Sequence, residues 1–278
     1  MQVGIIGGGV MGVGIAHRFS ARGAEVAVVD VDLDAATASV ERTRATLDKA
    51  VDRGKLEPEA AEGAKARLRP VAAIEELPVG LDVVVEAIIE DLEAKRAVLV
   101  RAEGREPRVL ATNTSSISID RLAEPLAHPE RFCGMHFFNP VWAMDLVEVI
   151  RGSATAPETV ERVLEIVEFL GMEPAVVNDA PGFATTRLGI VLGLEAIRMV
   201  EEGVAEPADI DRAMELGYGY PMGPLKTGDL VGLDVRLAIA EHLATVYGER
   251  FEPPRLLRQM VAEGRLGKKV GRGFYEWD

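Results

Sequence analysis

Two hydrophobic patterns divide the chain near residue 180. Up to that point, short apolar runs rich in Val and Ile alternate with stretches of helical period, which is typical of buried parallel strands joined by helices. Beyond it the strand pattern stops and only helical stripes remain. The patterns predict an α/β domain of residues 1–179 followed by an all-α domain of residues 180–278, with the boundary at a turn-rich segment that contains Pro181 and Gly182.

The expected elements follow from the period of each stretch. Strands are predicted at residues 2–6, 25–29, 81–85, 131–139, 146–150 and 173–177, and a further strand starts at residue 109. Helices of the first domain are predicted at residues 10–22, 33–53, 57–67 and 157–170, and another follows residue 90. Helices of the second domain are predicted at residues 183–202, 207–216, 230–247 and 254–263. Several of their apolar stripes are wide for so small a domain, which suggests a partner.

A glycine-rich turn follows the first predicted strand. Gly7, Gly9 and Gly12 have the spacing G-x-G-x-x-G, and Asp30 ends the second predicted strand. In such a unit the first glycine forms the tight turn, the second lets a pyrophosphate approach the backbone, and the third allows close helix–strand packing. The acid accepts hydrogen bonds from the adenosine ribose. Strand, glycines, helix, strand and acid in this order predict a Rossmann-type dinucleotide-binding domain.

The residues after Asp30 bear on the choice of dinucleotide. Val31 and Asp32 follow it, where an enzyme that uses NADP would carry a basic residue. A 2′-phosphate would be repelled there, so the pattern favours NAD over NADP. The glycine motif alone leaves FAD open.

His136 lies in an apolar run that ends at Pro140. By itself it is either a core histidine satisfied by hydrogen bonds or a proton acceptor. In the following predicted strand the period of two places Glu148 on the apolar face, where an unpaired carboxylate is costly. Glu148 therefore either pairs with His136 or lies at an exposed strand edge. A Glu148–His136 pair would fix the histidine tautomer and stabilise the imidazolium, as a general base requires.

Two other polar clusters have alternative interpretations. The sequence Thr-Asn-Thr-Ser-Ser at residues 112–116 follows a predicted parallel strand, where open α/β sheets bind ligands, but the same residues also form helix caps and turns. Lys49 and Arg53 form a basic cluster near Lys55. This cluster is either a solvated helix face or a binding site for ligand phosphates.

The composition limits the remaining classes of function. The formal net charge of −14 argues against nucleic acid or an anionic membrane as the main partner, because both require basic surfaces. No apolar run is long enough to span a bilayer, and the N-terminus lacks the features of a signal peptide, so we expect a cytoplasmic protein. The single cysteine, Cys133, excludes an intrachain disulfide and a cysteine-rich metal site, and we expect no metal.

Several ordered motifs resemble the L-3-hydroxyacyl-CoA dehydrogenase family, which includes bacterial 3-hydroxybutyryl-CoA dehydrogenases. The resemblance covers essentially the whole chain. The motifs that carry it are Asn113-Thr114-Ser115-Ser116, His136-Phe137-Phe138-Asn139-Pro140, Leu146-Val147-Glu148-Val149-Ile150, Ala180-Pro181-Gly182-Phe183, Pro221-Met222-Gly223-Pro224-Leu225, residues 228–234 and Gly271-Arg272-Gly273-Phe274-Tyr275.

The resemblance implies roles for individual residues. His136 would be the catalytic base, Glu148 the acid that orients it, and Ser115 and Asn139 polar groups beside the substrate. The cofactor contacts that it implies, in addition to Asp30, are Glu90, Lys95 and Lys269. The substrate contacts that it implies are Ser115, Thr186, Lys49 and Arg53, the last two through the CoA tail. Thr186 departs from the pattern, because the family usually has asparagine in that slot.

These features predict NAD-dependent, reversible oxidation of an L-3-hydroxyacyl-CoA to the 3-ketoacyl-CoA. The resemblance also implies homodimerisation through the helical domain. Two alternatives remain: an NAD-dependent dehydrogenase of a free hydroxy acid such as L-gulonate, and a non-catalytic NAD-binding or structural relative. A lysine-dependent β-hydroxyacid dehydrogenase is disfavoured, because the proton-transfer group here is a histidine. The sequence does not give the acyl-chain length or the physiological direction.

Overall fold

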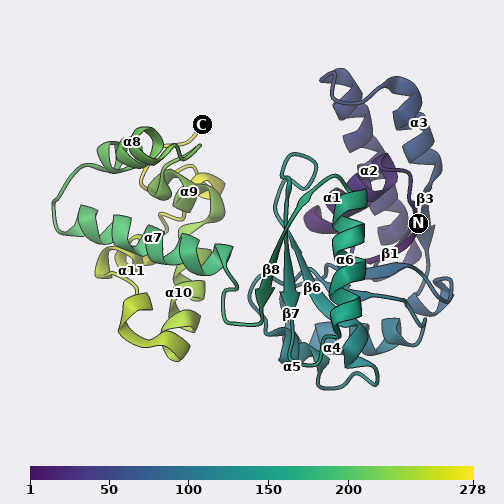
Figure 1. Ribbon diagram of the computed structural model, residues 1–278. Coiled ribbons are helices and arrows are strands. Elements are labelled where there is room, and N and C mark those ends of the chain that lie inside the picture. Colours follow the sequence, from purple (N-terminus) through teal and green to yellow (C-terminus); the bar gives the residue numbers. More distant parts are fainter. The chain divides into compact units, whose positions relative to one another are not determined.

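The computed structural model describes residues 1–278. The chain divides into two compact units, Met1–Ala180 and Pro181–Asp278 (Figure 1). The first unit has α/β architecture and the second contains helices but no sheet strand, as predicted. None of the helices is long and apolar enough to cross a membrane.

The first unit is built on one eight-stranded sheet with the strand order β3-β2-β1-β4-β5-β6-β7-β8. Its strands are β1 (Gln2–Ile6), β2 (Glu25–Val29), β3 (Leu68–Val71), β4 (Val83–Glu86), β5 (Leu110–Thr112), β6 (Phe132–Phe137), β7 (Leu146–Arg151) and β8 (Glu173–Asn178). Neighbouring strands are parallel except for β6 and β7, which are antiparallel. This is a doubly wound sheet whose strand order reverses next to β1, between β1 and β4.

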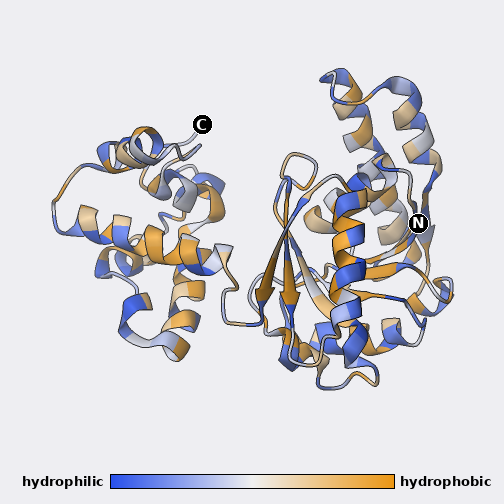
Figure 2. Ribbon diagram, viewed as in Figure 1, coloured by the Kyte–Doolittle hydropathy of each residue, from blue (hydrophilic) through white to orange (hydrophobic).

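Six helices accompany the sheet, and hydrophobic burial explains their positions. They are α1 (Val10–Ala21), α2 (Leu33–Asp52), α3 (Pro58–Ala66), α4 (Leu92–Glu103), α5 (Ile119–Ala123) and α6 (Pro157–Phe169). Alternate side chains of the central strands form one core cluster with residues of α1, α2 and α6, among them Phe19, Leu47 and Val163. Figure 2 shows the consequence: the strands are mainly hydrophobic, whereas α6 carries hydrophobic and hydrophilic residues along its length.

The second unit consists of α7 (Thr185–Glu201), α8 (Pro207–Tyr218), α9 (Pro224–Val231), α10 (Leu233–Tyr247) and α11 (Arg255–Ala262). Its own core includes Ile190 and Leu194 of α7 and Leu243 of α10. Asp229, which is fully buried, accepts hydrogen bonds from the backbone N–H groups of Phe274 and Tyr275 at 3.0 and 2.9 Å and so fixes the end of the chain.

The structure differs from the prediction at several elements, among them the short helices α5 and α9, which were not predicted. The helix predicted at residues 230–247 is interrupted at Gly232, whose φ of 105° is incompatible with a continuous helix, so α9 ends at Val231 and α10 begins at Leu233. Strand β3 was not predicted. Arg69 and Pro70 fill its centre, and it is an edge strand, where proline is tolerated and no apolar run is required.

Candidate active site

The glycine turn connects β1 to α1 in the geometry that the motif requires. Gly7 has a φ of 103°, which favours glycine, and its N–H donates to the carbonyl of Val29 at 2.8 Å. A Cβ on Gly12 would lie 1.8 Å from the carbonyl oxygen of Gly7, so only glycine fits there. Space is open at Gly9, which caps α1, so a phosphate can approach the backbone amides of the first turn.

A cavity of about 880 Å³ extends from this turn to the end of β2. Gly7, Gly9 and Asp30 line it. The Asp30 carboxylate accepts N–H hydrogen bonds from Gly8 at 2.9 Å and from Val31 at 2.8 Å, which fix its position at the rim. At one end of the cavity the amides of α1 are open to a diphosphate. At the other end the fixed Asp30 carboxylate can bind an adenosine ribose, so the residues present fit NAD.

His136 and Glu148 lie in register on the antiparallel strands β6 and β7. Nδ1 of His136 is 2.8 Å from Oε2 of Glu148. Both side chains are buried, Glu148 completely. The exposed-edge alternative for Glu148 is therefore wrong, because β8 covers the other side of β7. An imidazole whose Nδ1 faces a carboxylate in a poorly hydrated place is well suited to accept a proton.

A second cavity, of about 340 Å³, contains this histidine. Its lining includes Ser115, His136, Asn139 and Glu90. Met11, Ala87 and Ile88 line both this cavity and the larger one. The dinucleotide cavity therefore continues directly to the histidine.

Glu90 holds the turn that carries Ser115. Its Oε1 accepts hydrogen bonds from the Thr114 hydroxyl at 2.5 Å and from the N–H groups of Ser115 and Ser116, both at 3.0 Å. Burial alone would raise the pKa of Glu90, but the Thr114 hydroxyl, the Lys95 ammonium and the backbone donors outweigh it and hold the pKa below its usual range. A carboxylate thus organises the polar turn after β5.

The Lys95 ammonium group is paired with two carboxylates of the protein itself. Its Nζ lies 2.7 Å from Oε1 of Glu86 and 3.4 Å from Oε2 of Glu90, and the Lys95 and Glu86 side chains are at most 1% exposed. Glu86 also accepts from the Ile88 N–H at 2.7 Å, so the pair fixes the segment between the two cavities. Lys95 lines neither cavity. The role of Glu86 was missed, although a carboxylate ending an apolar strand was a visible signal.

Asn113 was interpreted only as one member of the polar run at residues 112–116, without a role of its own. Its Oδ1 accepts the N–H of Phe137 at 2.9 Å and so ties the end of β6 to the polar turn after β5. Asn113 also lines the cavity of His136. The signal that could have identified it is its place in the same polar run as Ser115.

The other predicted site residues lie outside these two cavities. Thr186 is half-buried in the first turn of α7, and Lys269 forms an ion pair with Asp234 at 2.6 Å; both belong to the helical unit. Lys49 and Arg53 are exposed at the C-terminal end of α2 and form no ion pair. They remain available to an external anion.

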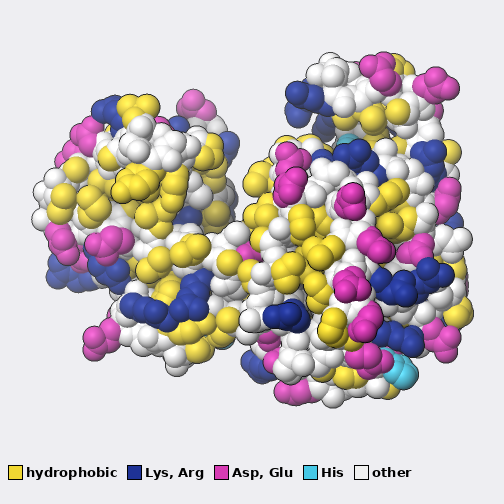
Figure 3. Space-filling model, viewed as in Figure 1, with side chains coloured by type: hydrophobic (Ala, Val, Ile, Leu, Met, Phe, Trp, Pro, Cys, Tyr) yellow, Lys and Arg dark blue, Asp and Glu magenta, His cyan; other side chains and the backbone are white.

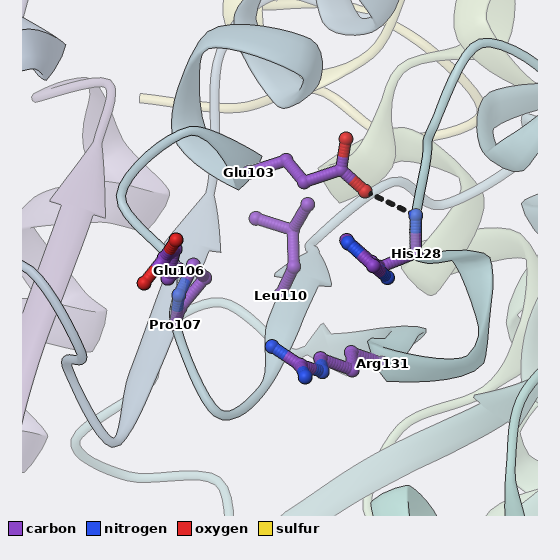
Figure 4. A pocket seen from close by; sticks show the side chains of 6 residues that line it. All are labelled: Glu103, Glu106, Pro107, Leu110, His128 and Arg131. Carbon is purple, nitrogen blue, oxygen red and sulfur yellow. Dashed lines mark hydrogen bonds between the residues drawn. The ribbon is translucent and has the colours of Figure 1, made fainter.

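A smaller cavity of about 210 Å³ lies near the start of β5 (Figure 4). Its ionisable lining residues are Glu103, Glu106, His128 and Arg131. The Glu103 carboxylate is already bound, because it accepts the His128 N–H at 2.7 Å. This cavity is on the amino-terminal side of the strands, opposite to the edge where such sheets bind ligands.

Comparison with protein families matches both units. Residues 2–180 match the family described as "3-hydroxyacyl-CoA dehydrogenase, NAD binding domain", and residues 182–277 match "3-hydroxyacyl-CoA dehydrogenase, C-terminal domain". The chain belongs to the 3-hydroxyacyl-CoA dehydrogenase family. As a member of this family it uses NAD and is an oxidoreductase that acts on 3-hydroxyacyl-CoA.

Individual relatives of this dehydrogenase agree with the family match. It is 42% identical to the 3-hydroxyadipyl-CoA dehydrogenase of Escherichia coli over 99% of its own length, and covers 58% of that protein. It is 40% identical to a probable 3-hydroxybutyryl-CoA dehydrogenase of Bacillus subtilis, covering 100% of this chain and 97% of the relative. The crystal structure of (S)-3-hydroxybutyryl-CoA dehydrogenase from Ralstonia eutropha superposes with a TM-score of 0.94 at 38% identity, covering 100% and 99% of the two chains.

Proposed function

We propose that this dehydrogenase oxidises the L-3-hydroxyl group of an acyl-CoA with His136 as the general base. The observation that carries the proposal is the buried His136–Glu148 pair, with Nδ1 2.8 Å from Oε2, in a cavity that continues the dinucleotide cavity. Because Nδ1 faces Glu148, Nε2 is the nitrogen that takes the hydroxyl proton. NAD, when bound, accepts the hydride at nicotinamide C4.

Glu148 stabilises the imidazolium that forms when His136 takes the proton. The carboxylate is fully buried, so its attraction to the positive ring is weakened little by solvent. It also holds the ring in one orientation, which keeps Nε2 directed to the substrate. A positioned base of this kind contributes roughly 10²- to 10⁴-fold to the rate.

Ser115 and Asn139 align the substrate beside the base. Both line the cavity of His136, and the Ser115 backbone is fixed by the Glu90 carboxylate at 3.0 Å. A hydroxyl and an amide held in place can hydrogen-bond the reacting oxygen without reorganising during the reaction.

The CoA moiety supplies phosphates that need positive partners. Lys49, in the last turn of α2, and Arg53, the residue that follows this helix, are exposed and have no internal ion pair, so they are assigned to the CoA tail. Thr186 is assigned to the acyl portion, where its hydroxyl replaces an amide and reaches less far. Lys269 is assigned to the cofactor, with its pairing to Asp234 as a competing contact.

The helical unit is assigned a second role as the surface of a homodimer. Leu188, Leu216 and Tyr218 are 66%, 81% and 78% exposed, and Figure 3 shows hydrophobic side chains gathered on this unit. Exposed apolar area of this kind is typical of a protein interface.

The acidic chain is not assigned a nucleic-acid partner. Its buried free thiol, Cys133, supports action in the reducing cytoplasm.

The discriminating experiment compares substrates with the purified protein. NADH oxidation is measured with acetoacetyl-CoA, with longer 3-ketoacyl-CoA esters, and with free 3-keto acids at the same concentrations. The proposal expects turnover of the CoA esters and a kcat/KM for free acids that is lower by at least about a hundredfold, since binding to the CoA moiety is lost. Comparable turnover of free acids would indicate a hydroxy-acid dehydrogenase, and no turnover of any substrate would indicate a non-catalytic relative.

A further inference from the structure

The residue that organises the adenosine end of the dinucleotide cavity from α2 is Arg42. Its Nη2 donates to the carbonyl oxygen of Gly8 at 2.7 Å. The N–H of the same glycine donates to Oδ2 of Asp30 at 2.9 Å. The Arg42 guanidinium therefore binds the carbonyl of Gly8, and the Asp30 carboxylate binds its N–H. Both side chains line the cavity.

Arg42 is the cation of this cavity that has no acidic partner. The other basic lining residue, Arg101, is bound through Nε and Nη2 by the two carboxylate oxygens of Glu75 at 2.7 and 2.8 Å. Arg42 forms no ion pair, even though carboxylates greatly outnumber cations in the chain. Its guanidinium keeps donors that the Gly8 carbonyl does not use.

Asp32 does not contribute a second carboxylate to the cavity. Its side chain caps α2 by accepting the Ala35 N–H at 2.7 Å, and it is not part of the lining. Asp30 is the one acidic residue that lines this cavity. In dinucleotide-binding sheets an acid at this position binds the 2′-hydroxyl of NAD, whereas a nearby arginine accommodates the 2′-phosphate of NADP. This chain carries both groups.

We propose that Arg42 is a specificity-determining residue of the cofactor site: it faces the 2′ side of the adenosine ribose and could bind a 2′-phosphate, and Asp30 is the single group that keeps the site selective for NAD. The inference rests on the cofactor site proposed above. Replacing the Asp30 carboxylate by a neutral acceptor removes the repulsion but keeps an oxygen for the Gly8 N–H. The phosphate then meets a guanidinium, and such charge-assisted pairs are the strong class of hydrogen bond.

The test measures equilibrium binding of NADH and NADPH, by fluorescence or calorimetry, without substrate. The Asp30→Asn variant is expected to bind NADPH at least about tenfold more tightly than the wild-type protein does, which is the effect of one hydrogen bond to a charged group. The double variant Asp30→Asn/Arg42→Gln should lose that gain. The matched control is Asp30→Asn/Arg69→Gln, which removes an exposed charge from β3 outside the cavity and should retain it.

Each outcome has a defined meaning. No gain of NADPH affinity in Asp30→Asn, or a gain that survives Arg42→Gln, overturns the inference. If Asp30→Asn does not fold, Arg42→Gln alone decides: it should weaken the residual NADPH binding of the wild-type site about tenfold more than Arg69→Gln does, and equal effects of the two variants overturn the inference. Failure of the wild-type protein to bind NADH would instead contradict the proposed cofactor site itself.

Discussion

Nδ1 of His136 lies 2.8 Å from Oε2 of Glu148 across the antiparallel strands β6 and β7. The two residues occupy directly opposed positions, so their side chains project from the same face of the sheet. The reversal of chain direction between these strands is what brings a carboxylate twelve residues later in the sequence to the histidine ring.

The first prediction concerns the base. Replacing His136 by glutamine removes the proton acceptor but keeps a polar side chain, so kcat with acetoacetyl-CoA should fall by about 10²- to 10⁴-fold. The dissociation constant for NADH should stay unchanged, because the dinucleotide cavity is lined by other residues. His128→Gln, at the exposed small cavity, is the control and should have wild-type kinetics. A kcat of His136→Gln near that of the wild type would refute its assignment as the base.

A second prediction concerns Thr186. An asparagine there would add an amide that reaches further, so Thr186→Asn should raise kcat/KM for acetoacetyl-CoA by about two- to tenfold, the effect of one neutral hydrogen bond. Steady-state kinetics of the variant measure this directly. Thr245→Asn, on an exposed part of α10, makes the same chemical change and should have no effect. A loss of activity in Thr186→Asn would show that the threonine is already adapted to this substrate.

A third prediction concerns recognition of CoA. The double variant Lys49→Gln/Arg53→Gln should raise KM for acetoacetyl-CoA by about two- to tenfold, because it removes two exposed charges that are proposed to pair with the CoA phosphates. Added salt should shrink the difference, since it screens such pairs. KM for acetoacetyl-pantetheine, which lacks the phosphates, should be the same in both proteins. An equal rise of KM for the two substrates would place these residues away from the CoA tail.

A fourth prediction concerns stability against pH. Burial, followed by the charge of Arg18, lowers the pKa of His17 from 6.5 to about 4, and its Nδ1 lies 2.8 Å from the Thr46 hydroxyl. Because the unfolded chain then binds the proton more tightly, the stability contributed by neutral His17 is complete above pH 6.5 and falls as the pH approaches 4. The difference between these pKa values corresponds to about 3 kcal/mol.

Denaturant unfolding at a series of pH values measures this effect. His17→Gln should unfold with a shallower loss of stability between pH 6.5 and pH 4 than the wild type, because glutamine does not titrate. The difference between the two curves isolates His17 from the carboxylates that titrate in both proteins. Parallel curves would show that His17 carries no such penalty.

Much of the fold could be predicted because buried strands and helices require apolar residues at regular positions along the sequence. The strands at residues 2–6 and 25–29 were predicted with their observed bounds, since both are apolar runs buried on two faces of a parallel sheet. Strand β3 has no such run, because an edge strand with Arg69 and Pro70 is held by backbone pairing to β2. The residues of β3 alone do not indicate that this segment pairs with β2.

Only those site residues could be predicted that belong to a pattern of residues close together in the sequence. The glycine spacing and the alternation around Glu148 are local, and they led to Asp30 and to the histidine pair. Contacts between distant segments were not accessible in this way. The sequence does not reveal that Lys95 is enclosed by Glu86, or that Arg42 reaches Gly8 across 34 positions. Such contacts depend on how α2 and α4 pack on the sheet.

The division of the chain after Ala180 has a consequence for how the enzyme can diversify. The proposed base, its orienting carboxylate and the glycine turn are all encoded in Met1–Ala180, whereas Thr186 lies in Pro181–Asp278. Changes in the helical unit can therefore leave the proposed base, its orienting carboxylate and the glycine turn untouched. Under the proposed assignment of Thr186 to the acyl portion, contact with the acyl group and proton transfer are encoded by different units of the chain.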